Sequence, residues 1–236
     1  MQPVTLLWQP AIVGGLFLAG QLLTFLAVAR GDVSVAAPVL GVKVLIVPAA
    51  SWLFFGEELS ARVWIAAAIA MIGIAFVQSR DVTVHRSRIV ASVGFAFLAA
   101  CSMTAFDLLI QRWAPIWGAG YLLPITFASA AILALAFLPL ADRPAELKRM
   151  HVIPLLAVGA LFMSIQAIGM TVTLGLFGDA TRVNIVYSLR GLWGVLLTWL
   201  LARHVTATTP GPSHRTMVMR LIGALLIAIS VVIAVT

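Results

Sequence analysis

The sequence predicts an all-α, polytopic membrane protein with eight transmembrane helices, and three observations support this fold class. Hydrophobic residues make up 62% of the 236 residues and charged residues only 10%, which is far from the composition of a water-soluble domain. The apolar residues form long runs, each near the ~20 residues that a helix needs to cross a bilayer. Runs such as WIAAAIAMIGIAFV do not alternate apolar and polar residues, as the strands of a membrane β-barrel would.

Eight apolar runs qualify as spans. They cover residues 9–29, 33–55, 62–79, 89–111, 118–140, 152–176, 181–202 and 217–235. Backbone groups in lipid must find their hydrogen bonds inside the segment, so each span is predicted to be a helix. Pro38 and Pro48 are expected to bend the second span. The links are short, the fourth being QRWAPIWG, residues 111–118, and they leave no room for a soluble domain.

A pattern of polar residues occurs twice in the chain at one spacing. In each copy a Gly-Asp pair opens a span, and a basic residue follows eleven positions after the aspartate. The pairs at the common offset of 147 are Gly31/Gly178, Asp32/Asp179, Lys43/Arg190 and Trp52/Trp199. Spans one to three thus correspond to spans six to eight. Equivalent spans are five apart, an odd number, so the two copies are expected to run in opposite directions through the membrane.

An inverted repeat of this kind is typical of secondary transporters. Residues 1–79 would form the first repeat, with three transmembrane helices, and residues 89–236 the second, with five. Chance similarity between apolar helices is the alternative interpretation.

Lys43 and Arg190 are the leading candidates for substrate binding. Each lies about halfway along its span, where a charged side chain is costly and usually functional. Together they could hold an anionic group, because arginine suits two-point contacts with a carboxylate or phosphate. The alternative is that each pairs with an acidic side chain or with backbone carbonyls and serves the structure.

Three further residues complete the candidate site. Asn184 and Tyr187 share one helical face with the small residues Gly191, Gly194 and Thr198. That face is either the wall of a cavity or a helix-packing seam. Asp107, in the fourth span, could titrate and couple transport to protons. It could equally be an ion-pair partner, or lie at the membrane interface beside Arg112.

Other classes of site find little support in the residues. The four histidines, His85, His151, His204 and His214, fall in loops or at span edges, so we expect no metal and no cofactor. No phosphate-binding glycine loop, HExxH or Ser-His-Asp arrangement occurs within the spans, so the chain is not predicted to be an enzyme. The net charge of +7 comes mainly from links between spans and is not a nucleic-acid signal. The expected partners are a small-molecule substrate and the lipid bilayer.

The stretch DVSVAAPVLGVKVLIVPAASWLFFGEELSARVWIAAAIAMIGIAFV carries a family resemblance. Its proline-bearing span ends in Gly56-Glu57, a short turn follows, and a span rich in small residues comes next. This order resembles the EamA type of the drug/metabolite transporter superfamily. The second copy, DATRVNIVYSLRGLWGVLLTWLLAR, is similar to the ninth helix of that family, although Arg203-His204 stands where a second Gly-Glu would be.

The resemblance implies ten helices, arranged five plus five around a central substrate cavity. This chain would then be a 3+5 remnant that lacks the first two helices. The implied function is secondary transport of a small metabolite across the cell membrane by alternating access. A membrane subunit that does not transport, or that depends on a partner to supply helices, is the alternative. A homo-oligomer also remains open.

The basic residues in the links bear on membrane orientation. Links after odd-numbered spans hold ten of them: Arg30, Arg80, Arg86, Arg88, Arg143, Lys148, Arg149, Arg203, Arg215 and Arg220. Links after even-numbered spans hold three: Arg62, Arg112 and Arg182. This bias places the odd links in the cytoplasm and both termini outside, in a multi-pass protein of the inner cell membrane. The resembled family has both termini inside, so charge and family disagree.

Overall fold

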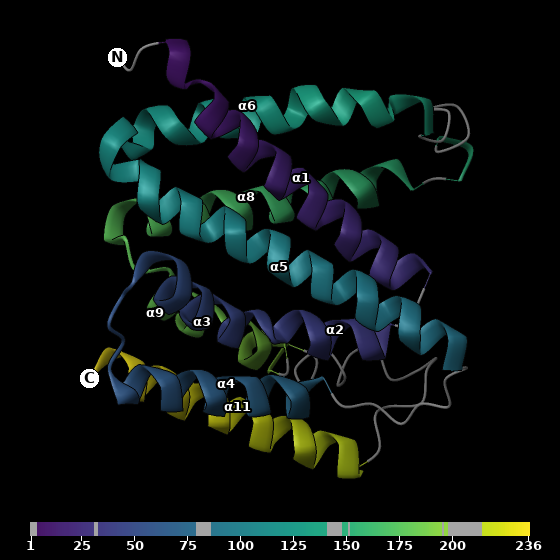
Figure 1. The fold of residues 1–236 in the computed structure, drawn as a ribbon. Coiled ribbons are helices and arrows are strands. Elements are labelled where there is room, and N and C mark those ends of the chain that lie inside the picture. The colour runs from purple at the N-terminus through teal and green to yellow at the C-terminus, as the bar shows by residue number, and fades with distance from the viewer. Residues whose placement is uncertain are drawn as a thin grey trace. The chain divides into compact units, whose positions relative to one another are not determined.

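Every regular element in the described part of the chain is a helix (Figure 1). A computed structural model describes residues 4–30, 33–78, 86–140, 148–150, 152–194, 196–197 and 214–236. The helices are η1 (Val4–Leu6), α1 (Trp8–Ala29), α2 (Val33–Gly41), α3 (Lys43–Phe55), α4 (Ala61–Val77), α5 (Arg86–Trp117), α6 (Ala119–Ala134), η2 (Leu135–Leu140), α8 (Ile153–Phe177), α9 (Ala180–Tyr187) and α11 (His214–Val235). The predicted all-α class is confirmed.

Six helical segments of the described residues are long and apolar enough to cross a membrane. They are Trp8–Ala29, Val35–Phe55, Ile89–Trp117, Ala119–Pro139, Ile153–Phe177 and Arg215–Val235. These segments indicate an integral, multi-pass membrane protein. The predicted third span appears as the shorter apolar helix α4, and much of the predicted seventh span lies outside the described residues. The number of eight spans therefore stays a prediction.

The expected loop at residues 111–118 is wrong, because α5 continues through it to Trp117. Pro115 lies inside the helix, and a proline removes one backbone hydrogen bond without always ending a helix. The turn comes at Gly118, whose φ of 76° suits glycine and whose N–H donates to the Ala114 carbonyl at 2.8 Å. As a result Asp107 lies ten residues before the end of its helix, deeper than expected.

The chain divides into two compact units, each described here by itself. Unit 1 comprises Met1–Leu18 and Leu109–Gly178, and unit 2 comprises Ala19–Leu108 and Asp179–Thr236. This division differs from the two sequence repeats, whose boundaries stay predictions. All five candidate site residues fall in unit 2, so the fold is described mainly there.

Aromatic and amide side chains hold unit 1 together at one end. The indole N–H of Trp117 donates to the Gln9 side-chain oxygen at 2.7 Å. Trp8 and Trp113 meet edge to face, with ring centroids 5.6 Å apart, a favourable aromatic geometry. Most of α8 is exposed in the chain, and its apolar surface is suited to lipid contact.

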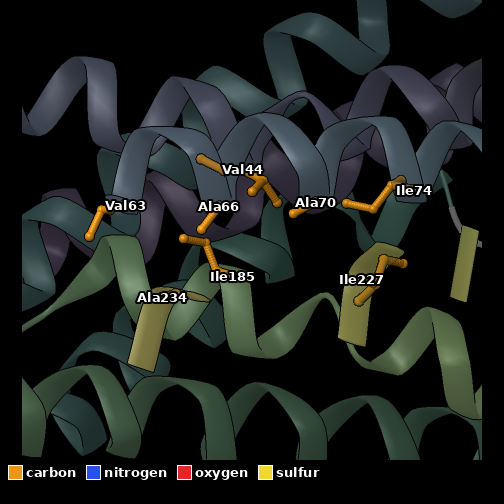
Figure 2. Packing of buried hydrophobic residues seen from close by; sticks show 9 residues of the cluster. Val44, Val63, Ala66, Ala70, Ile74, Ile185, Ile227 and Ala234 are labelled. Carbon is orange, nitrogen blue, oxygen red and sulfur yellow. The ribbon is translucent and has the colours of Figure 1, made fainter. Parts of the chain in front are cut away.

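Unit 2 has its core where α3, α4, α9 and α11 pack together. Figure 2 shows the buried cluster, which consists of Val44, Val63, Ala66, Ala67, Ala70, Ile74, Ile185, Ile227 and Ala234. Four of these nine residues are alanines, and such small residues allow helices to approach closely without a polar contact. Lys43 begins α3 and Asn184 lies in α9, so both residues belong to helices of this core.

Within that core α4 and α11 run side by side in opposite directions (Figure 1). A Cβ on Gly73 would lie 2.8 Å from the Gly223 carbonyl oxygen and 3.1 Å from the Ile227 nitrogen. A Cβ on Gly223 would lie 2.6 Å from both the Gly73 oxygen and the Val77 nitrogen. Residue numbers thus rise on one helix as they fall on the other. Opposite direction is what the inverted repeat requires of these two equivalent spans.

The close approach of these helices leads to a stability prediction. Gly223→Ala places a methyl group against the α4 backbone, so we expect the free energy of unfolding to fall by about 1–3 kcal/mol. Gly94→Ala is the matched control, because a Cβ there meets nothing within 4 Å and alanine favours helix by about 1 kcal/mol. In thermal unfolding in detergent, the melting temperature should therefore fall for Gly223→Ala and rise for Gly94→Ala. Equal stabilisation by both would contradict the packing of α4 on α11.

The second Gly-Asp pair forms a sharp helix boundary in the structure. Gly178 ends α8 with a left-handed φ of 61°. Asp179 then caps α9, its side chain accepting the Arg182 backbone N–H at 2.8 Å. The Arg182 side chain pairs with Asp179 at 2.8 Å and donates to the Ala234 carbonyl at 3.0 Å, which fixes the start of α9 to α11. The first Gly-Asp pair lies outside the described residues.

Candidate functional site

Two helices of unit 2 are interrupted just before a basic side chain. Helix α2 ends at Gly41, Val42 forms a turn, and α3 begins at Lys43. Helix α9 ends at Tyr187, a two-residue turn follows, and residues 190–194 are helical again. The interruptions fall at matching positions of the sequence repeat, because Lys43 and Arg190 are separated by the same offset of 147.

The two interruptions differ in their local structure. In the first copy the Val42 N–H donates to the Val39 carbonyl at 3.1 Å, an i to i−3 bond. This turn lies between Pro38 and Pro48, neither of which can donate a backbone hydrogen bond. The bend expected at these prolines is therefore present as a break between them.

In the second copy no proline is involved, and a serine lies in the turn. The Ser188 hydroxyl donates to the Ile185 carbonyl at 2.6 Å. The Leu189 N–H donates to the Val186 carbonyl at 3.0 Å, again an i to i−3 bond. Hydroxyl groups that bond to nearby carbonyls compete with regular helical bonding and can bend a helix. Ser230 makes the same bond to the Ile227 carbonyl within the unbroken α11, so the hydroxyl bond accompanies this interruption and does not by itself cause it.

Lys43, Asp107 and Asn184 form one polar cluster inside unit 2. The Lys43 Nζ lies 2.6 Å from the Asp107 Oδ2, and the Asn184 Nδ2 donates to the same oxygen at 2.6 Å. Asn184 also donates to the Ala180 carbonyl at 2.9 Å. Asp107 is 1% exposed. For Lys43 the geometry is thus the ion pair that the sequence left open as an alternative.

Arg190 has a different environment. Its guanidinium donates to the Tyr187 hydroxyl at 2.7 Å, and its central carbon lies 4.5 Å from the centre of the Tyr187 ring, within the range of a cation–π contact. Among the described residues no carboxylate pairs with Arg190. The buried carboxylate of Asp107 is already bound to Lys43. The Arg190 charge therefore remains free for another anion.

A cavity of about 70 Å³ brings these groups together. Its lining consists of Leu40, Gly41, Lys43, Val44, Ile74, Val77, Gln78, Asn184, Tyr187, Ser188, Arg190, Gly191 and Ile227. Four of the five predicted site residues therefore line one cavity, and Asp107 bonds to two of them. Gly194 does not line it, and Thr198 lies outside the described residues. The volume corresponds to a few water molecules, each of which occupies about 30 Å³ in the liquid.

Sequence reasoning missed Gln78 and Ser188 as lining residues. Gln78 was placed near the end of the third span, where a polar side chain is ordinary and gave no signal. Ser188 follows Tyr187, which lies on the predicted helical face, but was not itself counted on that face. Its place in the cavity lining accompanies the interruption of the helix at this position. A search for hydroxyl residues next to the basic residue of each copy would have found Ser188.

The interruptions place opposite partial charges beside the two cations. Lys43 lies two residues after the end of α2 and is the first residue of α3, and Arg190 lies three residues after the end of α9 and begins the helical residues 190–194. The carbonyls of a C-terminal end attract a cation and the N–H groups of an N-terminal end attract an anion, so the interruptions do not by themselves favour the cations. Among the described residues no three His, Cys, Asp or Glu side chains lie together as metal ligands would. The arrangement is therefore suited to holding an anion at Arg190 and hydrogen-bond donors at the carbonyl ends.

Comparison with known proteins finds one family model that matches the first third of the sequence. Residues 2–79 match the model of the EamA-like transporter family. One solved structure, titled only as the crystal structure of a protein, has a TM-score of 0.64 and 20% identity over 99% of this chain and 76% of that one. At this identity the likeness shows the fold alone. No curated protein matches the sequence.

The matched region contains the features that carried the predicted resemblance. It includes the proline-bearing segment of α2 and α3, the Gly56-Glu57 pair after α3, and the small-residue helix α4. Gly56 ends α3 in a left-handed conformation with φ 65°, which explains a glycine there. Residues 2–79 are therefore similar to the EamA-like transporter family, the group within the drug/metabolite transporter superfamily that the sequence resembles.

Proposed function

We propose that this protein is a secondary transporter that moves a small anionic metabolite across the membrane by alternating access. The substrate site is the cavity between the two interrupted helices of unit 2. One observation carries the proposal. Lys43 and Arg190 occupy matching positions of the repeat, each directly follows a helix interruption, and both line one cavity. Interrupted helices at corresponding positions are the usual location of the binding site in transporters built from inverted repeats.

Arg190 is the group that binds the substrate anion. Lys43 is paired with Asp107 at 2.6 Å, so its charge is already compensated. Arg190 presents a guanidinium to the cavity and donates a hydrogen bond to the Tyr187 hydroxyl. A guanidinium binds a carboxylate or phosphate through two parallel hydrogen bonds. The two-cation hypothesis from the sequence is thereby refined to one binding cation and one structural ion pair.

The interruptions also provide the movement that alternating access requires. A cavity of about 70 Å³ is smaller than the roughly 300–1,000 Å³ of pockets that enclose drug-sized ligands. The cavity must therefore widen to admit a metabolite. A chain hinges most readily at positions that lack regular helical hydrogen bonds. The turns at Val42 and at Ser188-Leu189 are such positions, and they adjoin the proposed site.

A binding screen followed by a transport assay tests this function. Purified protein is screened by thermal shift against small carboxylates, small phosphates and their uncharged analogues. Ligands that bind the native state raise the melting temperature. We expect anions to stabilise the protein and uncharged analogues to have no effect. The stabilising anion should then accumulate by counterflow in proteoliposomes.

Two results would contradict the proposal. If only uncharged analogues stabilise the protein, the substrate is not an anion and Arg190 does not bind one. Binding of an anion without counterflow would favour the partner-dependent membrane subunit. The control is Arg190→Gln in the same liposomes, which should weaken binding by about a hundredfold and reduce counterflow with it.

A further inference from the structure

Gln78 presents an unused hydrogen-bond acceptor at the proposed site. The residue ends α4 and its side chain lines the same cavity as Arg190. Its Oε1 atom is buried and, within the described part of the chain, has no hydrogen-bond partner. Buried polar atoms are paired in the great majority of cases, so each exception calls for an explanation. A ligand or water in the cavity would supply the missing donor.

The backbone around Gln78 also favours a hydrogen-bond donor or a cation. Gln78 is the C-cap of α4, and its N–H donates to the Ile74 carbonyl at 3.1 Å. The C-terminal end of a helix carries partial negative charge and attracts cations and hydrogen-bond donors. Ile74 and Val77, from the last turn of α4, line the cavity as well. The α4 wall is thus suited to a donor, whereas Arg190 is suited to an anion.

We propose that Gln78 determines substrate specificity by accepting a hydrogen bond from a hydroxyl or ammonium group of the substrate. The substrate class is then a small acid that carries such a donor beside its carboxylate or phosphate. This inference rests on the proposed function, because it places the acidic group of the substrate at Arg190. A site with a buried acceptor discriminates against an analogue without the donor, since the acceptor then stays unpaired.

Two pairs of acids that differ by hydroxyl groups provide the test. L-lactate is compared with propionate, and glycerol 3-phosphate with propyl phosphate, by thermal shift on the full-length protein in detergent. For the wild type we expect the hydroxylated member of at least one pair to bind about tenfold more tightly. Gln78→Leu should reduce that preference to within about twofold, by weakening the hydroxylated acid and sparing the other.

Matched variants separate this inference from the function on which it rests. Gln166→Leu makes the same change at an exposed position of α8 and should keep the preference. Gln78→Met is the second variant, in case leucine prevents folding, and the melting temperature without ligand reports on the fold. Equal affinities within both pairs for the wild type, or a preference that survives Gln78→Leu and Gln78→Met, would overturn the role of Gln78.

Failure of the proposed function would look different. If no acid binds, or if Arg190→Gln leaves the affinity for both members of a pair unchanged, the anion site itself is overturned and the inference with it. If both acids need Arg190 but bind equally well, the anion site stands and Gln78 has no part in specificity.

Discussion

Replacing Asp107 by leucine should lower the free energy of unfolding by about 3–5 kcal/mol, the largest stability effect we expect in this chain. The reason is the environment of Lys43. Its side chain is only 19% exposed and its Nζ lies 2.6 Å from the Asp107 carboxylate. Without that carboxylate, the ammonium group of this mostly buried side chain has no compensating charge. An uncompensated charge is far more costly there than the loss of one hydrogen bond.

A double-mutant cycle isolates the ion pair from its surroundings. Lys43→Met alone should also destabilise, because it leaves the Asp107 carboxylate with the Asn184 amide. The double variant Lys43→Met/Asp107→Leu removes both charges, and we expect it to be more stable than Asp107→Leu alone. Asn184 keeps its bond to the Ala180 carbonyl in every variant. Unfolding in detergent by added denaturant measures all four proteins. Simple additivity of the two single effects would contradict the pairing.

Replacing Arg190 by glutamine should weaken binding of the substrate anion by about a hundredfold, the size expected when a charged partner is removed. The same change should alter the free energy of unfolding by less than about 1 kcal/mol. Arg190 is exposed in the chain and pairs with no carboxylate of the described residues. The change at Arg190 is therefore expected to lower the ligand affinity and leave the stability nearly unchanged, unlike changes at Lys43 and Asp107.

Arg182→Gln is the matched control for Arg190→Gln. It removes the same charge from a residue of the same unit, but Arg182 contacts Asp179 and the Ala234 carbonyl, not the cavity. We expect it to leave the anion affinity unchanged. Titration of each variant with the anion found in the thermal-shift screen decides the question. A similar loss of affinity in both variants would mean that net charge, rather than the position of Arg190, attracts the ligand.

The sequence predicted which residues meet at the site better than it predicted how they interact. Lys43 and Arg190 stood out because a charge inside an apolar run is easily recognised and because the spacing repeats. The pairing of Lys43 with Asp107 was left open, because it depends on the packing of α3 against other helices. Asp107 was also placed too near the end of its span, because a loop was predicted at residues 111–118 where the structure continues the helix.

The helix interruptions, too, could be predicted from the sequence only in part. Pro38 and Pro48 predicted a bend in the second span, and the break at Val42 lies between them. The break at Ser188 could not be predicted in this way, because a serine in an apolar helix usually has no such effect. Ser230 makes the same kind of bond as Ser188, from its hydroxyl to the Ile227 carbonyl, inside the unbroken helix α11. The role of Gln78 likewise appears only when its burial is known.

Cysteine protection at Ser188 tests most directly whether the cavity between the interrupted helices is the substrate site. Ser188 lines the cavity and is buried, and the free Cys101 is first replaced by serine. In this background Ser188→Cys should react with a small, water-soluble thiol reagent, because water fills the empty cavity. The anion that stabilises the wild type should slow this reaction, and adding Arg190→Gln should remove the protection. A Ser188→Cys rate that the bound anion does not change would contradict the account and place the substrate elsewhere.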